Sequence, residues 1–149
     1  MPEGPESLLT SLPVEFLFRL EVQTLEPPPI AVAGGPHGDR LIVTASAGTF
    51  EGPRLSGRVV PGPGAEWATT LPGGSVRADV RLVLETDDGA PLLMTYNGVG
   101  TVGEDGLRVR IAPLFQAGAE RYQWLNEIQA VGLGTPLADG IRYDVYRLL

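Results

Sequence analysis

The chain has 149 residues, a formal net charge of −7 and 43% hydrophobic residues, which is the size and composition of one globular domain. It contains no cysteine and one histidine, His37. Thiolate chemistry, disulfides and zinc or copper sites built from several nitrogen or sulfur ligands are therefore excluded. All eleven basic residues are arginines, so no lysine can form a Schiff base. The acidic balance argues against a nucleic-acid partner.

The N-terminal stretch MPEGPESLLTSL lacks the basic start and long apolar run of a signal peptide. No stretch reaches the roughly 18 apolar residues that a membrane helix needs. We therefore expect a soluble cytoplasmic protein without a membrane partner, with one domain over residues 1–149 in which residues 1–12 are a loosely ordered extension. Homo-oligomerisation stays open.

The first predicted strand is Val14–Gln23, where strict alternation places Val14, Phe16, Phe18, Leu20 and Val22 on one face. The proline-rich run TLEPPPIAVAGGPHGD predicts a stiff connection. A strand is expected in RLIVTASAG, and another in RLSGRVVPG, which ends at a Pro-Gly cluster.

In the second half, the alternating strand Ser75–Thr86 leads through an Asp-Asp-Gly turn into PLLMTYNGVG, which predicts a β-hairpin. Alternation also predicts strands in GLRVRIAPLF and IRYDVYRLL, whereas AGAERYQWLNE can form one short helix near residues 117–125. Eight or nine strands with this spacing predict an all-β fold, a single antiparallel β-barrel or sandwich. A barrel of about eight strands can enclose one small ligand.

Polar residues on strand Ser75–Thr86 are the first candidates for chemistry. Asp79 and Arg81 are two residues apart and share one strand face. That face is either solvated, or it lines a pocket with Arg81 as an anion clamp and Asp79 as its orienting partner or a base. Arg108 and Arg110 pose the same choice between a carboxylate site and charges that protect a sheet edge.

Other polar and aromatic residues admit structural roles. Tyr96 and Asn97 either form a turn or orient a carbonyl group, and Trp67 and Trp124 are typical of core or plug residues. His37 lies in a glycine-rich loop, and without it no Ser-His-Asp set can be assembled. No phosphate-binding or dinucleotide motif is present, so no nucleotide cofactor is expected.

The stretches GTFEGPRLSGRVVPGPGAEW, ADVRLVLETDDGA, RIAPLFQAGAERYQWLN and RYDVYRL resemble domain-of-unknown-function family 3237, from about Phe16 to Leu148. The resemblance implies an antiparallel β-barrel of lipocalin-like size with a ligand pocket and no assigned reaction. It draws attention to Glu51, Gly52, Arg54, Trp67, Asp79, Arg81, Arg110, Phe115, Tyr122, Trp124 and Asn126. The corresponding family segment reads Thr-Ala-Pro-x-Phe-Glu-Thr. In this chain its first threonine is replaced by Ile111, its glutamate by Gln116 and its last threonine by Ala117. The loss of these hydroxyl and carboxyl groups favours a more apolar substrate.

We therefore expect a small-molecule-binding barrel that acts, without a cofactor or metal, as an isomerase, lyase or cyclase, for example in natural-product biosynthesis. Its largely apolar organic substrate would bind in the lumen. The predicted catalytic residues are Glu51, Asp79 and Arg81, with Glu51 expected to point into the lumen and not to cap a turn. The predicted substrate-binding residues are Trp67, Tyr96, Asn97, Arg110, Phe115, Tyr122, Trp124 and Asn126. The alternatives are a non-catalytic carrier and a structural barrel filled by its own side chains.

Overall fold

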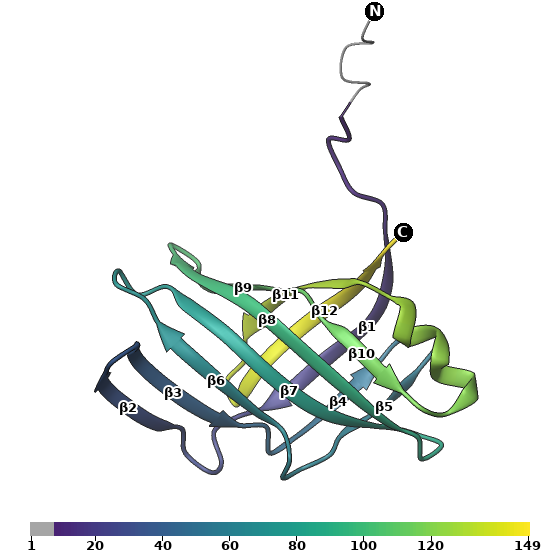
Figure 1. The fold of residues 1–149 in the computed structure, drawn as a ribbon, viewed down its shortest axis with the longest axis horizontal. Helices are drawn as coiled ribbons and strands as arrows, with labels where there is room; N and C mark the ends of the chain where they lie inside the picture. Colours follow the sequence, from purple (N-terminus) through teal and green to yellow (C-terminus); the bar gives the residue numbers. More distant parts are fainter. Residues whose placement is uncertain (1–7) are drawn as a thin grey trace, which may run out of the picture.

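A computed structural model describes residues 8–149 and shows one antiparallel sheet that curls into a barrel (Figure 1). Its strands are β1 (Val14–Gln23), β2 (Ile30–Gly35), β3 (Gly38–Thr44), β4 (Ala47–Glu51), β5 (Ser56–Val59), β6 (Ala65–Thr70), β7 (Val76–Thr86), β8 (Pro91–Gly103), β9 (Gly106–Ile111), β10 (Leu114–Ala117), β11 (Ala130–Pro136) and β12 (Gly140–Leu148). The described residues contain one short helix, η1 (Glu120–Glu127), which is a 3-10 helix. The predicted all-β barrel is confirmed. Residues 1–7 of the predicted N-terminal extension lie outside the described residues.

Eight of the strands close a ring in the order β7, β8, β9, β11, β12, β1, β4 and β5, which returns to β7. The long strands β7 and β8 each have two partners on one edge. One end of β7 pairs with β5 and the other end with β6, whereas β8 pairs with β10 near its start and with β9 near its end. Strands β6, β3 and β2 therefore extend away from the ring as a flap, at the opposite end of the molecule from η1 (Figure 1).

The inward faces of the ring strands form the hydrophobic core. Phe18 packs edge to face against Phe50 and Phe115, with ring centroids 5.5 and 5.8 Å away. Farther along the barrel, Tyr96 of β8 meets Tyr143 of β12 at 5.4 Å. All five rings are buried, so the protein's own side chains fill the lumen at these positions.

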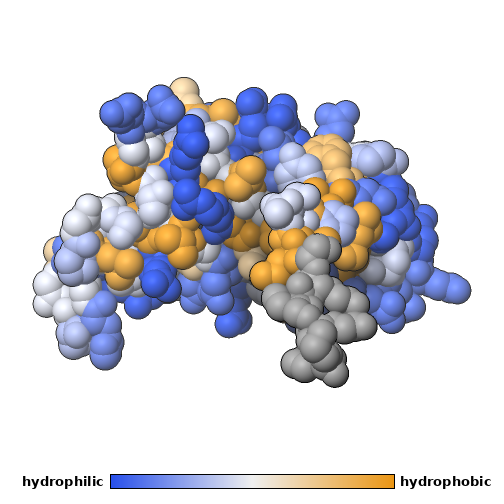
Figure 2. All heavy atoms as spheres, turned by 90° about the horizontal axis from the view of Figure 1, so that it is seen from above, coloured by the Kyte–Doolittle hydropathy of each residue, from blue (hydrophilic) through white to orange (hydrophobic). Residues whose placement is uncertain are grey.

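The face assignment within β1 differs from the strict alternation that the sequence predicts. The register between β1 and β12 shifts between Phe16 and Phe18, which marks a β-bulge. The bulge lets both Leu17 and Phe18 turn inward, while Val14 and Phe16 point outward and are exposed. Figure 2 shows that hydrophobic residues reach the surface on the face seen from above.

The hairpin of β7 and β8 is confirmed, and its turn contains Gly89 at φ 88°. Four strands depart from the prediction. The expected connection before β3 in fact contains β2, and β4 forms as a separate strand where the strand expected in RLIVTASAG was to end. Strands β6 and β11 form in Gly- and Ala-containing stretches with little alternation of hydrophobic and polar residues. The expected strand across GLRVRIAPLF is divided into β9 and β10, because Pro113 has no N–H to donate to a ladder. In residues 8–149 no helix is long and apolar enough to cross a membrane.

Candidate functional site

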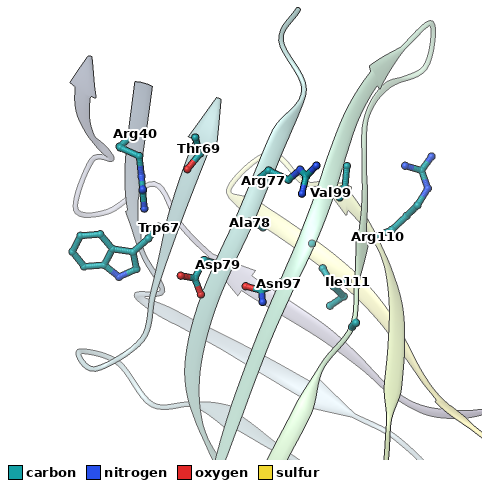
Figure 3. A pocket seen from close by; sticks show the side chains of 12 residues that line it. Arg40, Trp67, Thr69, Arg77, Ala78, Asp79, Asn97, Val99, Arg110 and Ile111 are labelled. Atoms are coloured by element: carbon teal, nitrogen blue, oxygen red, sulfur yellow. The ribbon is translucent and has the colours of Figure 1, made fainter. Parts of the chain in front are cut away.

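A row of directly opposed residues crosses the outer face of the sheet from the flap into the ring. The strand registers place Arg40 beside Thr69, Thr69 beside Arg77, Arg77 beside Val99, and Val99 beside Arg110. Because side chains directly opposite each other on adjacent strands point to the same face, these five side chains form one outward line. We call it the arginine row (Figure 3).

A second row on the same face runs parallel to the arginine row, displaced by two residues along each strand. Asp79 of β7 is opposite Asn97 of β8, and the constant register between β6 and β7 places Trp67 on the other side of Asp79. Figure 3 shows Trp67, Asp79 and Asn97 in a line across the three strands. Arg77 and Arg81 flank Asp79 on the same strand, two residues away in each direction and on the same face. Asp79 is thus the centre of a polar cluster.

The two rows line a groove of about 680 Å³ on the outer face, with Ala112 at its margin. A second groove of about 370 Å³ shares Asp79 and Asn97 with the first and extends over Arg81, Thr95 and Gln116. The volume of the first groove is within the range of small-molecule sites. Trp67, with 50% of its surface exposed, gives this groove an aromatic wall.

The charged groups of the groove are free to meet a ligand. In residues 8–149, Asp79 makes no ion pair or side-chain hydrogen bond, and neither do Arg40, Arg77 and Arg81. Arg110 donates one hydrogen bond of 3.3 Å to the hydroxyl of Thr101. The pairing of Asp79 with Arg81 that the sequence suggested does not form. Both remain available, and guanidinium groups outnumber the carboxylate.

Six of the eleven predicted site residues line the two grooves, and five of them have exposed side chains there, namely Trp67, Asp79, Arg81, Asn97 and Arg110. The sixth, Tyr96, borders the second groove but is buried. The five exposed side chains meet on the outside of the barrel and not in its lumen. Arg40, Thr69, Arg77 and Val99 also line the groove, and none of these four was among the predicted site residues. Arg40 and Thr69 could not be assigned from sequence because β6 and the flap were not foreseen.

Glu51 is not part of this cluster. Its neighbour Phe50 takes the inward position and is buried, whereas Glu51 is exposed, so the expectation that it points into the lumen is wrong. Glu51 pairs in register with Ser56, whose hydroxyl donates to Asp87 in the turn after β7. Asp79 lies eight residues before that turn, roughly 26 Å along the strand.

The remaining predicted residues have structural surroundings. Tyr96 and Phe115 are buried in the core. The Asn126 side chain clamps Ala117, accepting from its N–H at 2.7 Å and donating to its carbonyl at 2.9 Å. Tyr122 donates to Asp88 at 2.9 Å, and the Arg54 guanidinium stacks 3.7 Å from the Trp124 ring. These contacts fasten η1 over one end of the barrel.

One ionisable residue on the inner face was missed. Glu66 of β6 is opposite Val43 and Val80, so it points inward beside Tyr96 and Tyr143. Burial raises the pKa of the Glu66 carboxyl, and burial raises the pKa of both tyrosines. The sequence signal was weak, because Glu66 lies in the Gly- and Pro-flanked stretch where no strand was expected. In the described part of the chain no three His, Cys, Asp or Glu side chains are placed to hold a metal ion.

Fold and site together define a small antiparallel β-barrel with a polar, arginine-rich groove on its outer face. Residues 12–148 match the family described as "Protein of unknown function (DUF3237)", and the chain belongs to that family. The family resemblance seen in the sequence is thereby confirmed.

Relatives extend the comparison to one enzyme. The chain is 31% identical over 93 residues to the hydroalkoxylation enzyme phnH of Penicillium herquei, covering 62% of this chain and 56% of that enzyme. It thus spans just over half the length of that relative in the sequence match. It is also 29% identical over 126 residues to a UPF0311 protein of Rhodopseudomonas palustris, covering 75% of this chain and 82% of the relative.

Solved structures agree on the fold. A β-barrel-like protein of Acinetobacter baumannii AYE superposes with a TM-score of 0.87 at 28% identity, over 97% of this chain and all of that one. An enzyme from Penicillium herquei superposes with a TM-score of 0.77 at 25% identity, over 97% of this chain and 99% of that one. The chain's family is thus described as one of unknown function, and one distant relative of the chain is named as a hydroalkoxylation enzyme.

Proposed function

We propose that the protein is a cofactor-independent enzyme that closes a ring by adding a hydroxyl group across a carbon–carbon double bond of a small organic substrate. The observation that supports this most directly is Asp79, a carboxylate without a partner in the described residues, between Arg77 and Arg81 and opposite Trp67 in the groove. The name of the Penicillium herquei relative, a hydroalkoxylation enzyme, supports the same reaction class.

The surrounding charges favour an anionic route over a cationic one. Arginine guanidinium groups beside Asp79 would raise the energy of a carbocation and stabilise a developing oxyanion. A substrate in which the double bond is conjugated to a carbonyl group fits this environment. The planar, conjugated part of such a molecule can lie against Trp67.

Each step of the reaction then has a group to perform it. Asp79 accepts the proton of the substrate hydroxyl, and the oxygen forms a C–O bond to the β-carbon of the enone. The π electrons move to the carbonyl oxygen, whose negative charge the arginines stabilise. The α-carbon takes the proton back from the Asp79 carboxyl group, and the carbonyl re-forms. One O–H and one π bond are exchanged for one C–O and one C–H bond, so the product is an isomer and no co-reactant is consumed.

A kinetic assay tests the proposal. The closure of hydroxyaryl enones, starting with 2′-hydroxychalcone, is followed by absorbance with the protein and with the Asp79→Asn variant. We expect acceleration over buffer by the parent and a loss of about 100-fold or more in Asp79→Asn, the usual range for a proton-transfer group. Glu104→Gln, which removes an exposed carboxylate in the β8–β9 turn, is the control and should leave the rate unchanged. Equal rates for the parent and Asp79→Asn would reject Asp79 as the base. Binding without turnover across the panel would indicate a carrier.

A further inference from the structure

The arginines of the protein fall into two groups. Six of the eleven pair with a carboxylate within residues 8–149, and Arg54 stacks on Trp124. The other four have no carboxylate partner in the described residues, and all four lie on the outer face along the two grooves: Arg40, Arg77, Arg81 and Arg110. With eighteen acidic residues in the chain, four neighbouring guanidinium groups without a carboxylate partner in the described residues indicate that the anion comes from outside the protein.

The arginine row sets the position of that anion. Neighbouring strands are about 4.8 Å apart, so Arg77 and Arg110, two strands apart, flank the short Val99 side chain. Figure 3 shows Arg77 extending from β7 toward Val99, with Arg110 on the other side. A carboxylate above Val99 can therefore be reached from both sides by guanidinium groups, which bind carboxylates through paired N–H donors.

The aromatic wall lies at a defined separation from this position. Trp67 is two strands from Val99 and one row away, roughly 12 Å by strand spacing and residue rise. Asp79 and Asn97 lie between the two points. A molecule that reaches from the arginines to the tryptophan must be elongated and flat, and its middle passes over Asp79.

We propose that the groove is specific for an elongated, conjugated organic acid, with its carboxylate between Arg77 and Arg110 and its distal ring against Trp67. This inference rests on the proposed function, because it takes the groove as the active site and names the class of substrate or product. The acid group anchors one end, the ring anchors the other, and the reacting double bond lies beside Asp79.

Three unreactive probes separate the parts of this proposal. The carboxylate trans-stilbene-4-carboxylate has the acid and a distal ring, trans-stilbene-4-carboxamide lacks the charge, and benzoate lacks the distal ring. Their dissociation constants are measured by calorimetry for the parent and for Arg77→Gln, Arg110→Gln and Trp67→Ala. Arg108→Gln is the matched control, since Arg108 is on the same strand as Arg110 but pairs with Asp105 at 3.1 Å.

We expect the stilbene acid to bind at least tenfold more tightly than its amide and than benzoate. In Arg77→Gln and Arg110→Gln, the acid should no longer bind more tightly than the amide. In Trp67→Ala, the acid should no longer bind more tightly than benzoate. Arg108→Gln should keep both differences in affinity. Equal binding of acid and amide would overturn the acid class while leaving the groove as the site. Absence of binding by all three, or loss in Arg108→Gln as well, would overturn the groove. Because the probes do not react, this result is independent of whether enones are turned over.

Discussion

At the residue scale, close backbone approaches determine which positions of the barrel must be glycine. Gly57 of β5 pairs in register with Thr86 of β7, and a Cβ atom at Gly57 would be 2.0 Å from the carbonyl oxygen of Glu85. Gly52, at the turn before β5, would be equally close to the carbonyl of Leu17. The two glycines at positions 52 and 57 of the motif GTFEGPRLSG therefore allow neighbouring backbone segments to approach closely where any side chain would collide.

We expect Gly57→Ala to destabilise the fold by about 3 kcal/mol, the upper range for overpacking, because the obstructing atom belongs to the backbone and cannot rotate away. Urea unfolding followed by circular dichroism measures the change. Gly118→Ala is the control, since a Cβ there meets nothing within 4 Å, and it should stay within about 0.5 kcal/mol of the parent. Equal stability of both variants would show that β5 and β7 can separate at this point.

The buried carboxyl group of Glu66 makes the free energy of unfolding depend on pH, and the direction of this dependence follows from its raised pKa. Burial favours its neutral form, so the folded protein keeps a proton that the unfolded chain releases above the ordinary pKa of 4.5. The contribution of Glu66 to stability is therefore fully present below that value and is lost as the pH rises through the raised folded-state pKa. Relative to Glu66→Gln, the free energy of unfolding of the parent should fall as the pH increases from 4 to 8.

Urea titrations of both proteins across this range provide the measurement, and the difference between them removes the effects of other groups. Asp88 and Asp144 act in the opposite direction. Hydrogen bonds from Thr86 and from Arg19, respectively, lower the pKa of these carboxyl groups. Parallel curves for the parent and Glu66→Gln would mean that the carboxylate is fully hydrated in the folded state.

At the element scale, η1 acts as a plug that side-chain hydrogen bonds hold in place. Besides the Asn126 clamp on Ala117, Arg121 and Tyr122 both contact Asp88 in the β7–β8 turn, and Leu125 is fully buried. The residues that made RYQWLN recognisable as a family motif are thus explained by the closure of one barrel end, away from the groove.

We expect Asn126→Ala to lower stability by about 1–2 kcal/mol, since it leaves the N–H and carbonyl of Ala117 without their partners. Gln123→Ala, which removes a single hydrogen bond of 3.1 Å to Gly118, should cost less and is the control. Urea unfolding compares the two variants. Probe binding in the groove should not change in either, and a loss of binding in Asn126→Ala would place η1 in the site.

How much of the molecule could be predicted also depends on the element. Alternation located β1 and the β7–β8 hairpin, because half-buried strands repeat with a period of two. It failed for β11, where inward positions such as Gly132 and Gly134 pack against Ile111 and Tyr143 and have no side chain to reveal the pattern. Asp79 and Arg81 were correctly predicted to share one strand face. Alternation could not show which face points outward, because that depends on long-range strand pairing, including that of the flap.

At the scale of the whole molecule, a chain with net charge −7 is proposed to bind an anion. Whether it can depends on how the repulsion from the net charge compares with the attraction from the nearby arginines. Seven charges at about 20 Å, a radius suited to a domain of this size, repel a carboxylate by roughly 1.5 kcal/mol in unscreened water. At 0.1 M salt that distance is about two Debye lengths, so little of the repulsion remains. Each guanidinium at contact distance contributes about 1 kcal/mol even at the dielectric constant of water. The local attraction therefore exceeds the global repulsion.

The affinity for trans-stilbene-4-carboxylate should accordingly fall several-fold between 0.05 and 0.5 M sodium chloride, because the contacts in an open groove are themselves partly screened. The uncharged amide should show no such decrease, and Arg77→Gln should reduce the slope for the acid, since one of the attracting charges is removed. Calorimetric titrations at four salt concentrations give the slopes. An affinity for the acid that rises with salt would mean that the repulsion from the net charge dominates and that Arg77 and Arg110 do not contact the carboxylate.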